Sequence, residues 1–373
     1  MLIGVPKEIK TLEYRVGLVP SSVKEFTSRG HEVLMETNAG AGINFTDADY
    51  EQAGAKIASS AQEVFEKSDM IIKVKEPQAQ ECAMLREDQI LFTYLHLAAD
   101  AAQTQGLIDS KSIAIAYETV TGPNGYGLPL LEPMSEIAGR LSVQVGAYYL
   151  QKHMGGLGRL IGGVPGVKPA EVLIIGGGVS GFHAAQMATG LGANVTILEK
   201  SNARMRFLDE YFHGRANIVY SNLDILEREL QVADLVIGAV LIPGASAPKL
   251  IRKDMLPTMK KGSVMVDIAI DQGGCFETSK PTTHDTPTYV VDDVVHYCVA
   301  NMPGAVPLTS ALALNHSVLP YALKLADKGW QAALGADANF LNGLNVCKGH
   351  VTNEAVASSL GLDFTPATNL LAA

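Results

Sequence analysis

An apolar strand that runs into a glycine-rich turn and then into a helix constrains this chain more than any other feature. Residues 171–186 read EVLIIGGGVSGFHAAQ, in which Gly176, Gly178 and Gly181 have the spacing GxGxxG. The first glycine permits a tight turn, the second lets the backbone approach a pyrophosphate, and the third lets helix and strand pack closely. The same spacing also occurs in turns that bind nothing, so neighbouring segments decide between the two.

The next strand favours a bound dinucleotide. The segment NVTILEK carries an acidic residue, Glu199, just before its final lysine. Glu199 stands 18 residues after Gly181. An acidic side chain at this place accepts hydrogen bonds from both hydroxyls of an adenine ribose. Its charge repels a 2′-phosphate, which predicts NAD rather than NADP as the cofactor. Lys200 and Arg204 follow closely, and either could serve a phosphate instead.

Short apolar runs alternate with amphipathic segments from the start of the chain, as in LIGVP, SSVKEFTSRG and HEVLMETN. This alternation is typical of βαβ units around a parallel sheet. At 373 residues the chain exceeds the size at which a single core keeps growing, which predicts two domains. We therefore expect an α/β protein with two Rossmann-like, doubly wound domains, joined by long helices and separated by a cleft.

The two series of segments meet in a long predicted helix within residues 133–153, where Ser135 can act as the N-cap. The chain turns helical again after about residue 305, and the connectors of an inserted domain usually return to the first domain. We expect a discontinuous substrate and catalytic domain of residues 1–134 and 305–373. Residues 135–304 should form the NAD-binding Rossmann domain.

Charge and cysteine content argue against several classes of protein. The net charge is −10 at pH 7 and the Lys and Arg residues are scattered, so there is no basic stripe for nucleic acid. Four cysteines without a CxxC pair predict free thiols in a reducing cytosol. The N-terminus soon turns charged, and the apolar runs are too short for a membrane helix. We expect a cytoplasmic protein with no nucleic-acid or membrane partner.

Three residues of the first domain carry the chemistry that a nicotinamide enzyme needs. Arg15, in EYRVGLVP, can point inward to bind a carboxylate through its planar fork, although a solvated surface arginine is commoner. Lys75, in KVKEP, follows an apolar strand, and at least one of Lys73 and Lys75 is expected to be a plain strand-end charge. His96, in LFTYLHLAAD, suits proton transfer near neutral pH, although a lone histidine among apolar residues is more often a core residue. Asp271, from the second domain, would have to face His96 across the cleft.

Two further strand ends of the second domain carry small residues, GAVLIPG at 238–244 and DIAIDQGG at 267–274. Their backbone could pass close to a nicotinamide ring, since strand ends deliver the ligand contacts of such a sheet. Ordinary turn chemistry explains both segments equally well, so spacing alone leaves the two interpretations open.

Taken together, these segments resemble the bacterial alanine dehydrogenase family over essentially the whole chain. The resemblance is carried, in the family's order, by GVPKEIKTLEYRVGLVP, KVKEP, LFTYLHLA, AYETV, PMSEIAGRLSVQVGAYYL, GGVPGV, VDIAIDQGGCFET, PTYVVDDVVHYCVANMPGAVP and ALALNHSVLPY. This combination is far more specific than the glycine spacing. It implies reversible oxidative deamination of L-alanine to pyruvate and ammonium with NAD, and a homohexamer as the typical assembly.

The resemblance also implies roles for individual residues. Arg15 and Lys75 bind substrate, His96 donates or accepts the proton, and Asp271 is the second catalytic residue. The apolar neighbours of His96 would keep the surroundings of the imidazole dry. The cofactor contacts fall in the long helix, the glycine turn, the acidic strand end and the later strand-end loops: Ser135, Gly176, Gly178, Val179, Ser180, Gly181, Glu199, Arg204, Ser221, Val240, Leu241, Ile268, Ala269, Asn301 and Met302.

Two positions depart from the family's pattern. Glu199 stands where the family commonly has aspartate, which lengthens the reach and keeps the ribose-binding chemistry. Some relatives carry an acidic residue and a histidine one helical turn apart as a metal pair. The corresponding helix here, YALKLADKGW, has Lys324 and Lys328, so we predict no metal there.

Three other interpretations are open from the sequence alone. The NAD-binding component of a proton-pumping transhydrogenase has a similar fold, but it moves hydride between two nucleotides and needs no amino-acid pocket. The presence of Arg15, Lys75 and His96 together therefore favours the dehydrogenase. A dehydrogenase for another amino acid and an NAD sensor without turnover are the remaining alternatives.

Overall fold

The computed structural model describes residues 1–240 and 247–371. Two compact units are present, Met1–Met134 with Val306–Ala373 and Ser135–Ala305. The chain passes from the first to the second within helix α6 (Glu132–Tyr149). The prediction that Ser135 caps this helix is wrong, because the helix already begins at Glu132. Pro133 suits the first helical turn, where its missing N–H needs no partner.

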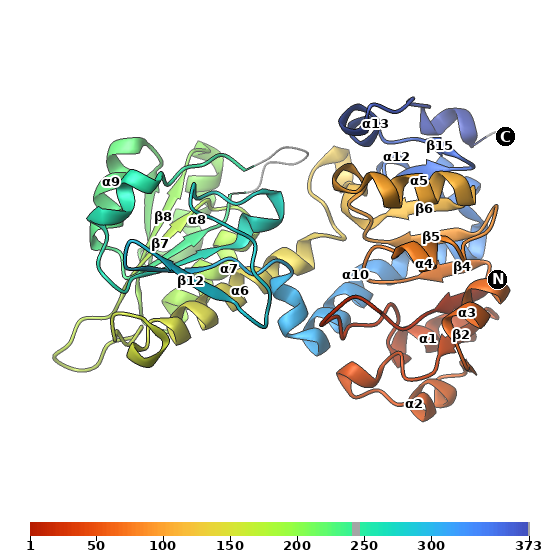
Figure 1. Ribbon diagram of the computed structural model, residues 1–373, viewed down its shortest axis with the longest axis horizontal. Helices are drawn as coiled ribbons and strands as arrows, with labels where there is room; N and C mark the ends of the chain where they lie inside the picture. Colours follow the sequence, from red (N-terminus) through yellow and green to blue (C-terminus); the bar gives the residue numbers. More distant parts are fainter. Residues whose placement is uncertain (241–246, 372–373) are drawn as a thin grey trace. The chain divides into compact units, whose positions relative to one another are not determined.

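The first unit is built on a mixed sheet in the order β15-β14-β6-β5-β4-β1-β2-β3, with the C-terminal strands at one end (Figure 1). Strands β1 to β6 pair in parallel, and β14 and β15 extend the sheet antiparallel beyond β6. Its strands are β1 (Leu2–Val5), β2 (Glu32–Glu36), β3 (Lys56–Ala58), β4 (Met70–Ile72), β5 (Ile90–Thr93), β6 (Ile113–Ala116), β14 (Leu344–Cys347) and β15 (His350–Val351).

Helices cover both faces of this sheet. On one face, Ile71 and Leu91 share a core cluster with Val64 of α3 (Ala61–Lys67) and Leu107 of α5 (Ala101–Ser110). On the other face, Phe92 contacts Phe340, because successive side chains of a strand point to opposite faces. The helices of this unit are α1 (Pro20–Ser28), α2 (Asp47–Gln52), α3 (Ala61–Lys67), α4 (Ala79–Cys82), α5 (Ala101–Ser110), α10 (Pro307–Lys328), α11 (Trp330–Gly335), α12 (Ala338–Leu341) and α13 (Glu354–Leu360).

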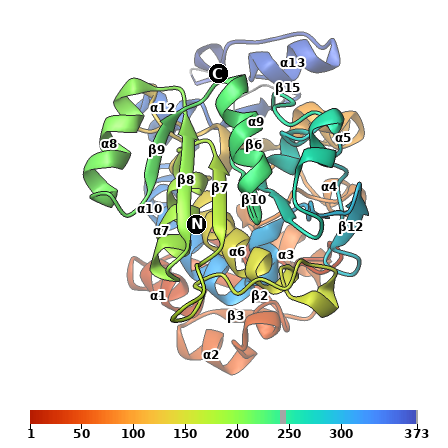
Figure 2. The same ribbon diagram turned by 90° about the vertical axis from the view of Figure 1, so that its left-hand side faces the viewer.

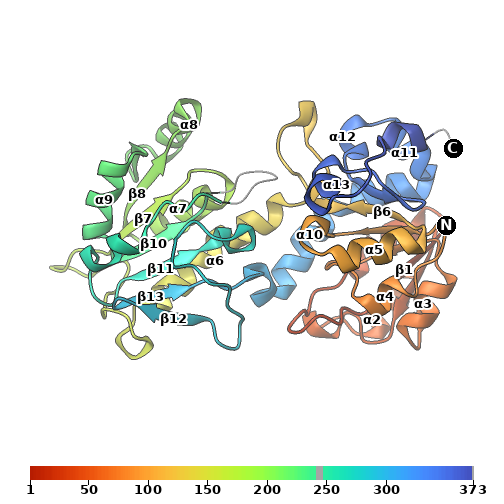
Figure 3. The same cartoon turned by 45° about the horizontal axis from the view of Figure 1, so that its top comes forward.

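The second unit has a sheet in the order β12-β13-β11-β10-β7-β8-β9, which Figure 3 shows from β8 through to β12. All neighbours pair in parallel except the antiparallel edge strand β12. Figure 2 shows α8 alongside β9 at the opposite edge. The elements are β7 (Glu171–Ile175), β8 (Asn194–Glu199), β9 (Asn217–Tyr220), β10 (Leu235–Gly238), β11 (Val264–Asp267), β12 (Thr288–Val291), β13 (Val294–Tyr297), α7 (Val179–Gly190), α8 (Asn202–Phe212) and α9 (Leu223–Val232).

The parallel strands of both sheets follow the same order, β3-β2-β1-β4-β5-β6 in the first unit and β9-β8-β7-β10-β11-β13 in the second. In this order the winding reverses between the first and fourth strands, and ligands bind outside the carboxyl ends at that switch point. The expectation of two Rossmann-like, doubly wound α/β domains is confirmed. The switch points lie at β1 and β4 and at β7 and β10. None of the helices within the described ranges is both long and apolar enough to cross a membrane.

Candidate functional site

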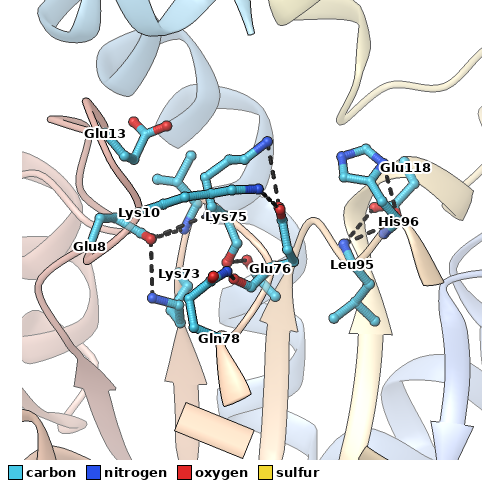
Figure 4. Close-up of polar contacts among 12 residues, drawn as sticks. Glu8, Lys10, Glu13, Lys73, Lys75, Glu76, Gln78, Leu95, His96 and Glu118 are labelled. Atoms are coloured by element: carbon cyan, nitrogen blue, oxygen red, sulfur yellow. Dashed lines mark hydrogen bonds and ion pairs between the residues drawn. The ribbon is translucent and has the colours of Figure 1, made fainter. Parts of the chain in front are cut away.

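The carboxyl ends of β1, β4 and β5 bring predicted substrate and catalytic residues to one edge of the first sheet. These strands are parallel neighbours, so their carboxyl ends meet at the same edge. Lys75 follows β4, His96 follows β5, and Arg15 lies in the loop between β1 and α1. Figure 4 shows Lys75 and His96 above the ends of the strands, beside several carboxylates that the sequence did not single out.

Arg15 is buried, so it is not a solvated surface arginine. Its Nε and Nη2 donate to Glu13 Oε1 and Oε2, both at 2.6 Å, and its Nη1 donates to Met134 Sδ at 3.3 Å. Burial by itself would lower the pKa of Arg15, but the Glu13 carboxylate outweighs it and raises that pKa, so the guanidinium stays charged. Glu13 stands two residues before Arg15 in the sequence, and this spacing was the signal that could have revealed the pair.

The two lysines of KVKEP have different surroundings. Lys73 is fully buried, with Nζ 2.7 Å from Glu81 Oε1 and 3.1 Å from Glu8 Oε2. Burial favours a low pKa for Lys73, but the two carboxylates outweigh it and raise the pKa above its usual value. Lys73 is thus a structural charge, though inside the fold rather than at a solvated strand end. Lys75 Nζ lies 3.4 Å from Glu76 Oε2, and its side chain keeps some exposure.

His96 lies outside the strand, in a left-handed conformation with φ of +52°. Its side chain is 48% exposed, so the prediction of dry surroundings is wrong. The reason is local: Leu95 and Leu97 point into the core, and the intervening left-handed residue turns its side chain outward. The ring stacks on Tyr94, with 5.9 Å between ring centroids and 8° between ring planes. Tyr94 is itself fixed, since its hydroxyl donates to the Leu130 carbonyl at 2.5 Å.

The glycine turn at the end of β7 has the geometry that the sequence predicts. Gly176 has φ of +97°, and a Cβ on Gly181 would come within 1.8 Å of the Gly176 carbonyl oxygen. A Cβ on Gly178 would meet no atom within 4 Å, so the backbone there is open to an approaching group. Gly178 is also the N-cap of α7, where no side chain caps the helix. An uncapped helix N-terminus behind an open glycine suits a phosphate.

Glu199 and Arg204 are both held against this turn. Glu199 Oε2 accepts from the Gly177 amide at 2.9 Å, and Oε1 accepts from the amides of Lys200 and Ser201 at 2.7 and 2.8 Å. Arg204 Nε donates to the Gly177 carbonyl at 2.5 Å. Burial lowers the pKa of Arg204, and Glu199 opposes this shift. The acidic strand end and the glycine turn are therefore one hydrogen-bonded group.

Several other predicted cofactor residues lie around the same edge of the second sheet. On α6, a Cβ at Gly139 would come within 2.2 Å of the Ser180 carbonyl oxygen, so α6 packs against the start of α7 there, and Ser135 lies one helical turn earlier on α6. The Ser221 amide donates to the Glu199 carbonyl at 2.9 Å. The remaining described positions follow the ends of β10, β11 and β13: Val240, Ile268, Ala269, Asn301 and Met302. Leu241 lies outside the described residues.

Asp271 is exposed, in the 3₁₀ helix Ile268–Gln272 that follows β11. The buried carboxylate of Asp267 anchors this segment: Oδ1 accepts from the Ala269 amide at 3.1 Å, and Oδ2 accepts from the Cys275 amide at 2.9 Å. Burial raises the pKa of Asp267, although hydrogen bonds from Ser279 and Cys275 oppose the shift. Asp267 was not among the residues predicted from the sequence, although an aspartate that ends an otherwise apolar strand is a signal for such an anchor.

The described residues contain no group of three or more His, Cys, Asp or Glu side chains placed to hold a metal ion. Lys324, on α10, has Nζ 3.5 Å from Asp337 Oδ2.

Comparisons with known proteins agree over the whole chain. The family description "Alanine dehydrogenase/PNT, N-terminal domain" matches residues 4–138, and "Alanine dehydrogenase/PNT, C-terminal domain" matches residues 142–354. The chain is 57% identical over 371 residues to an alanine dehydrogenase of Halomonas elongata and 53% identical over 372 residues to one of Mycolicibacterium smegmatis. In both cases 100% of each chain is covered.

Solved structures give the same result. An L-alanine dehydrogenase matches with a TM-score of 0.94 at 52% sequence identity, covering 97% of this chain and 99% of that one. A transhydrogenase from Sinorhizobium meliloti matches with a TM-score of 0.81 at 23% identity, covering 95% and 100% of the two chains. The second match shows a likeness of fold alone.

Proposed function

The chain belongs to the alanine dehydrogenase/PNT family, and from this premise we propose which residues perform its reaction. It is an oxidoreductase that deaminates L-alanine reversibly to pyruvate and ammonium with a nicotinamide dinucleotide. The assignment of residues rests on one observation: Arg15, Lys75 and His96 follow β1, β4 and β5, neighbouring strands whose carboxyl ends lie at the same edge of the sheet. A transhydrogenase that moves hydride between two nucleotides has no need of such a set.

The second unit is the proposed cofactor domain, and NAD the proposed cofactor. The open backbone at Gly178 and the uncapped start of α7 fit a pyrophosphate, and Glu199 fits an unphosphorylated ribose. A nicotinamide bound by these residues would supply the acceptor for the hydride that leaves the Cα of L-alanine. Further contacts are proposed at Ser135, Gly176, Val179, Ser180, Gly181, Arg204, Ser221, Val240, Leu241, Ile268, Ala269, Asn301 and Met302.

The first unit is the proposed substrate domain. Arg15 supplies the buried cation that the carboxylate of alanine or pyruvate needs, and Glu13 fixes the plane of its guanidinium. Lys75 binds the substrate and polarises the pyruvate carbonyl in the reductive direction. Lys75 lies in the loop after β4, and β4 pairs with β5, the strand that precedes His96.

His96 is the proposed proton donor and acceptor as water adds to, or leaves, the imino acid. Its Nδ1 lies 3.9 Å from Glu118 Oε1, so Nε2, on the other side of the ring, is the atom proposed to exchange the proton with substrate. Asp271 is the proposed second catalytic residue, whose carboxylate stabilises the cationic ammonium or iminium species.

The test of this function is direct. The purified chain, mixed with NAD and L-alanine at alkaline pH, should produce reduced nicotinamide, followed by its near-ultraviolet absorbance. Glycine and L-serine in parallel reactions test for another amino-acid dehydrogenase. NADH binding without turnover of any of the three would instead support a silent binding module and contradict the proposal.

We also propose a homo-oligomer, a homohexamer by family resemblance, that works in the cytoplasm. The four cysteines are free and buried, which suits a reducing compartment. Light scattering coupled to size-exclusion chromatography measures the assembly, and a monomer at micromolar concentration would contradict it.

A further inference from the structure

Two glutamates hold the backbone at His96 and Lys75, the residues proposed to meet the substrate. Neither glutamate has a proposed contact with the substrate. The first is Glu118, in the 3₁₀ helix Tyr117–Thr119 that follows β6. Its Oε1 accepts from the His96 amide at 2.6 Å and from the Leu95 amide at 3.1 Å, and its Oε2 lies 3.2 Å from the Leu95 amide. The carboxylate therefore clamps two consecutive amides, one of them belonging to His96.

The second is Glu8, in the loop that follows β1. Its Oε1 accepts from the Val74 amide at 2.7 Å and from the Lys75 amide at 3.2 Å, while its Oε2 faces Lys73 Nζ. The Lys75 carbonyl is held from the other side, because the Thr93 hydroxyl donates to it at 3.0 Å. Figure 4 shows both carboxylates below the side chains of Lys75 and His96.

The two clamps share one design. In each, a glutamate from the segment that follows a neighbouring strand, β1 or β6, accepts hydrogen bonds from two successive N–H groups of the loop that follows β4 or β5. Hydrogen bonds to a carboxylate are shorter and stronger than those to a neutral acceptor. At His96 the clamp also holds a non-glycine residue in a left-handed conformation, which persists only where surrounding contacts enforce it.

We propose that Glu118 and Glu8 are positioning residues for the reaction, which set the backbone of His96 and Lys75 and thereby aim both side chains at the substrate. This inference rests on the proposed function, because it takes His96 and Lys75 as the groups that meet the substrate. Neither glutamate needs to touch the substrate. A displacement of about 1 Å in a reacting group is enough to lower a rate about 100-fold.

The test compares Glu118→Ala, which removes the acceptor, with Glu118→Gln, which keeps an oxygen at the same reach. The matched control is Glu87→Ala, an exposed glutamate of the same unit. The Ala variant should lose about 100-fold in kcat for L-alanine oxidation with an unchanged NADH dissociation constant. The Gln variant should recover most of kcat, and the control should behave as the unmodified chain does.

Hydrogen exchange provides a readout that does not depend on turnover. The amides of Leu95 and His96 should exchange faster in Glu118→Ala than in Glu118→Gln, and those of Val74 and Lys75 faster in Glu8→Ala than in Glu8→Gln. If an alanine variant fails to fold, Glu118→Asp, whose shorter side chain withdraws the carboxylate, takes its place. Unchanged exchange or unchanged kcat in the folded variants would overturn the inference.

Failure of the inference and failure of the proposed function give different results. If His96→Ala loses turnover while Glu118→Ala keeps it, the function stands and the clamps play no part in catalysis. If the unmodified chain does not oxidise L-alanine, the function fails, and faster exchange in the alanine variants would show only that the glutamates hold the loops.

Discussion

The two units share one strand order, yet the segments at their switch points are opposite in character. In the second unit, only residues 176–178 separate β7 from α7, and glycines leave the helix N-terminus open. In the first unit, residues 6–19 separate β1 from α1 and carry Glu8, Glu13 and Arg15. The shared strand order determines at which edge of the sheet a ligand binds. The segment between the first strand and the first helix determines which chemical groups contact the ligand.

The starts of the two corresponding helices make the difference concrete. The amide of Val19, the N-cap of α1, donates to Asn315 Oδ1 at 3.0 Å, and Pro20 removes another donor from the helix start. Like α7, α1 has no side-chain cap, but Val19 and Pro20 leave no free donor at its first two positions, whereas the start of α7 lies behind Gly178, where a Cβ would meet no atom. We infer a division of labour, in which the second unit binds phosphate through backbone and the first unit binds and reacts through side chains.

The largest expected effect is on turnover through the first unit alone. His96→Ala should lower kcat for L-alanine about 10²- to 10⁴-fold, because it removes the group that moves the proton. NADH affinity, measured by fluorescence titration, should stay unchanged, since the proposed cofactor contacts lie in the second unit. His350→Ala, an exposed histidine on β15, is the control. If His96→Ala also lost NADH binding, His96 would have a structural role in both units. The proposed separation of substrate chemistry from cofactor binding would then be contradicted.

The second prediction separates stability from activity within the first unit, using one substitution at two nearby positions. Lys73→Met leaves Glu8 and Glu81 buried without their cation, so the free energy of unfolding in urea should fall by about 3–5 kcal/mol. Lys75→Met should change it by about 1 kcal/mol or less and instead lower kcat/KM for L-alanine. Equal stability of the two variants would contradict the structural role of Lys73.

The sequence predicted the parts of the site that depend on local patterns. The glycine turn, Glu199 and the strand-end positions of Lys75 and His96 follow from spacing and alternation within single segments. The family resemblance added their roles, and the likeness of the whole chain to alanine dehydrogenases confirmed the activity. The fold class needed no more than the repeated alternation of strand and helix.

What the sequence did not reveal depends on which distant segments become neighbours. Glu8 binds amides 66 and 67 residues away, and Glu118 binds amides 22 and 23 residues away, which is visible only once the strand order is known. The exposure of His96 was misjudged because its buried neighbours were read as its own environment. The pairing of Asp271 with His96 joins two units and stays a prediction.

The third prediction tests the second unit at two positions of the glycine turn. A Cβ at Gly181 would collide with the Gly176 carbonyl, so Gly181→Ala should cost about 1–3 kcal/mol of unfolding free energy and abolish NADH binding. Gly178→Ala meets no protein atom, so it should leave the unfolding free energy unchanged and weaken NADH binding alone. Tight NADH binding by Gly178→Ala would contradict a phosphate at the start of α7.

The smallest expected effect is on the choice between NAD and NADP, which the second unit should control without help from the first. Glu199→Gln removes the charge that repels a 2′-phosphate and keeps an oxygen for the Gly177 amide, but its NH2 group cannot accept from the Lys200 and Ser201 amides, so the unfolding free energy of the variant is measured alongside. Two unit charges about 4 Å apart repel by about 1 kcal/mol at the dielectric constant of water, so the ratio of kcat/KM for NAD over NADP should fall about fivefold. Glu25→Gln, an exposed glutamate on α1, removes the same charge from the first unit and should leave the ratio unchanged. If Glu25→Gln shifted the ratio as far as Glu199→Gln does, net charge rather than the acidic end of β8 would select the cofactor. The proposal that the second unit alone selects the cofactor would then be contradicted.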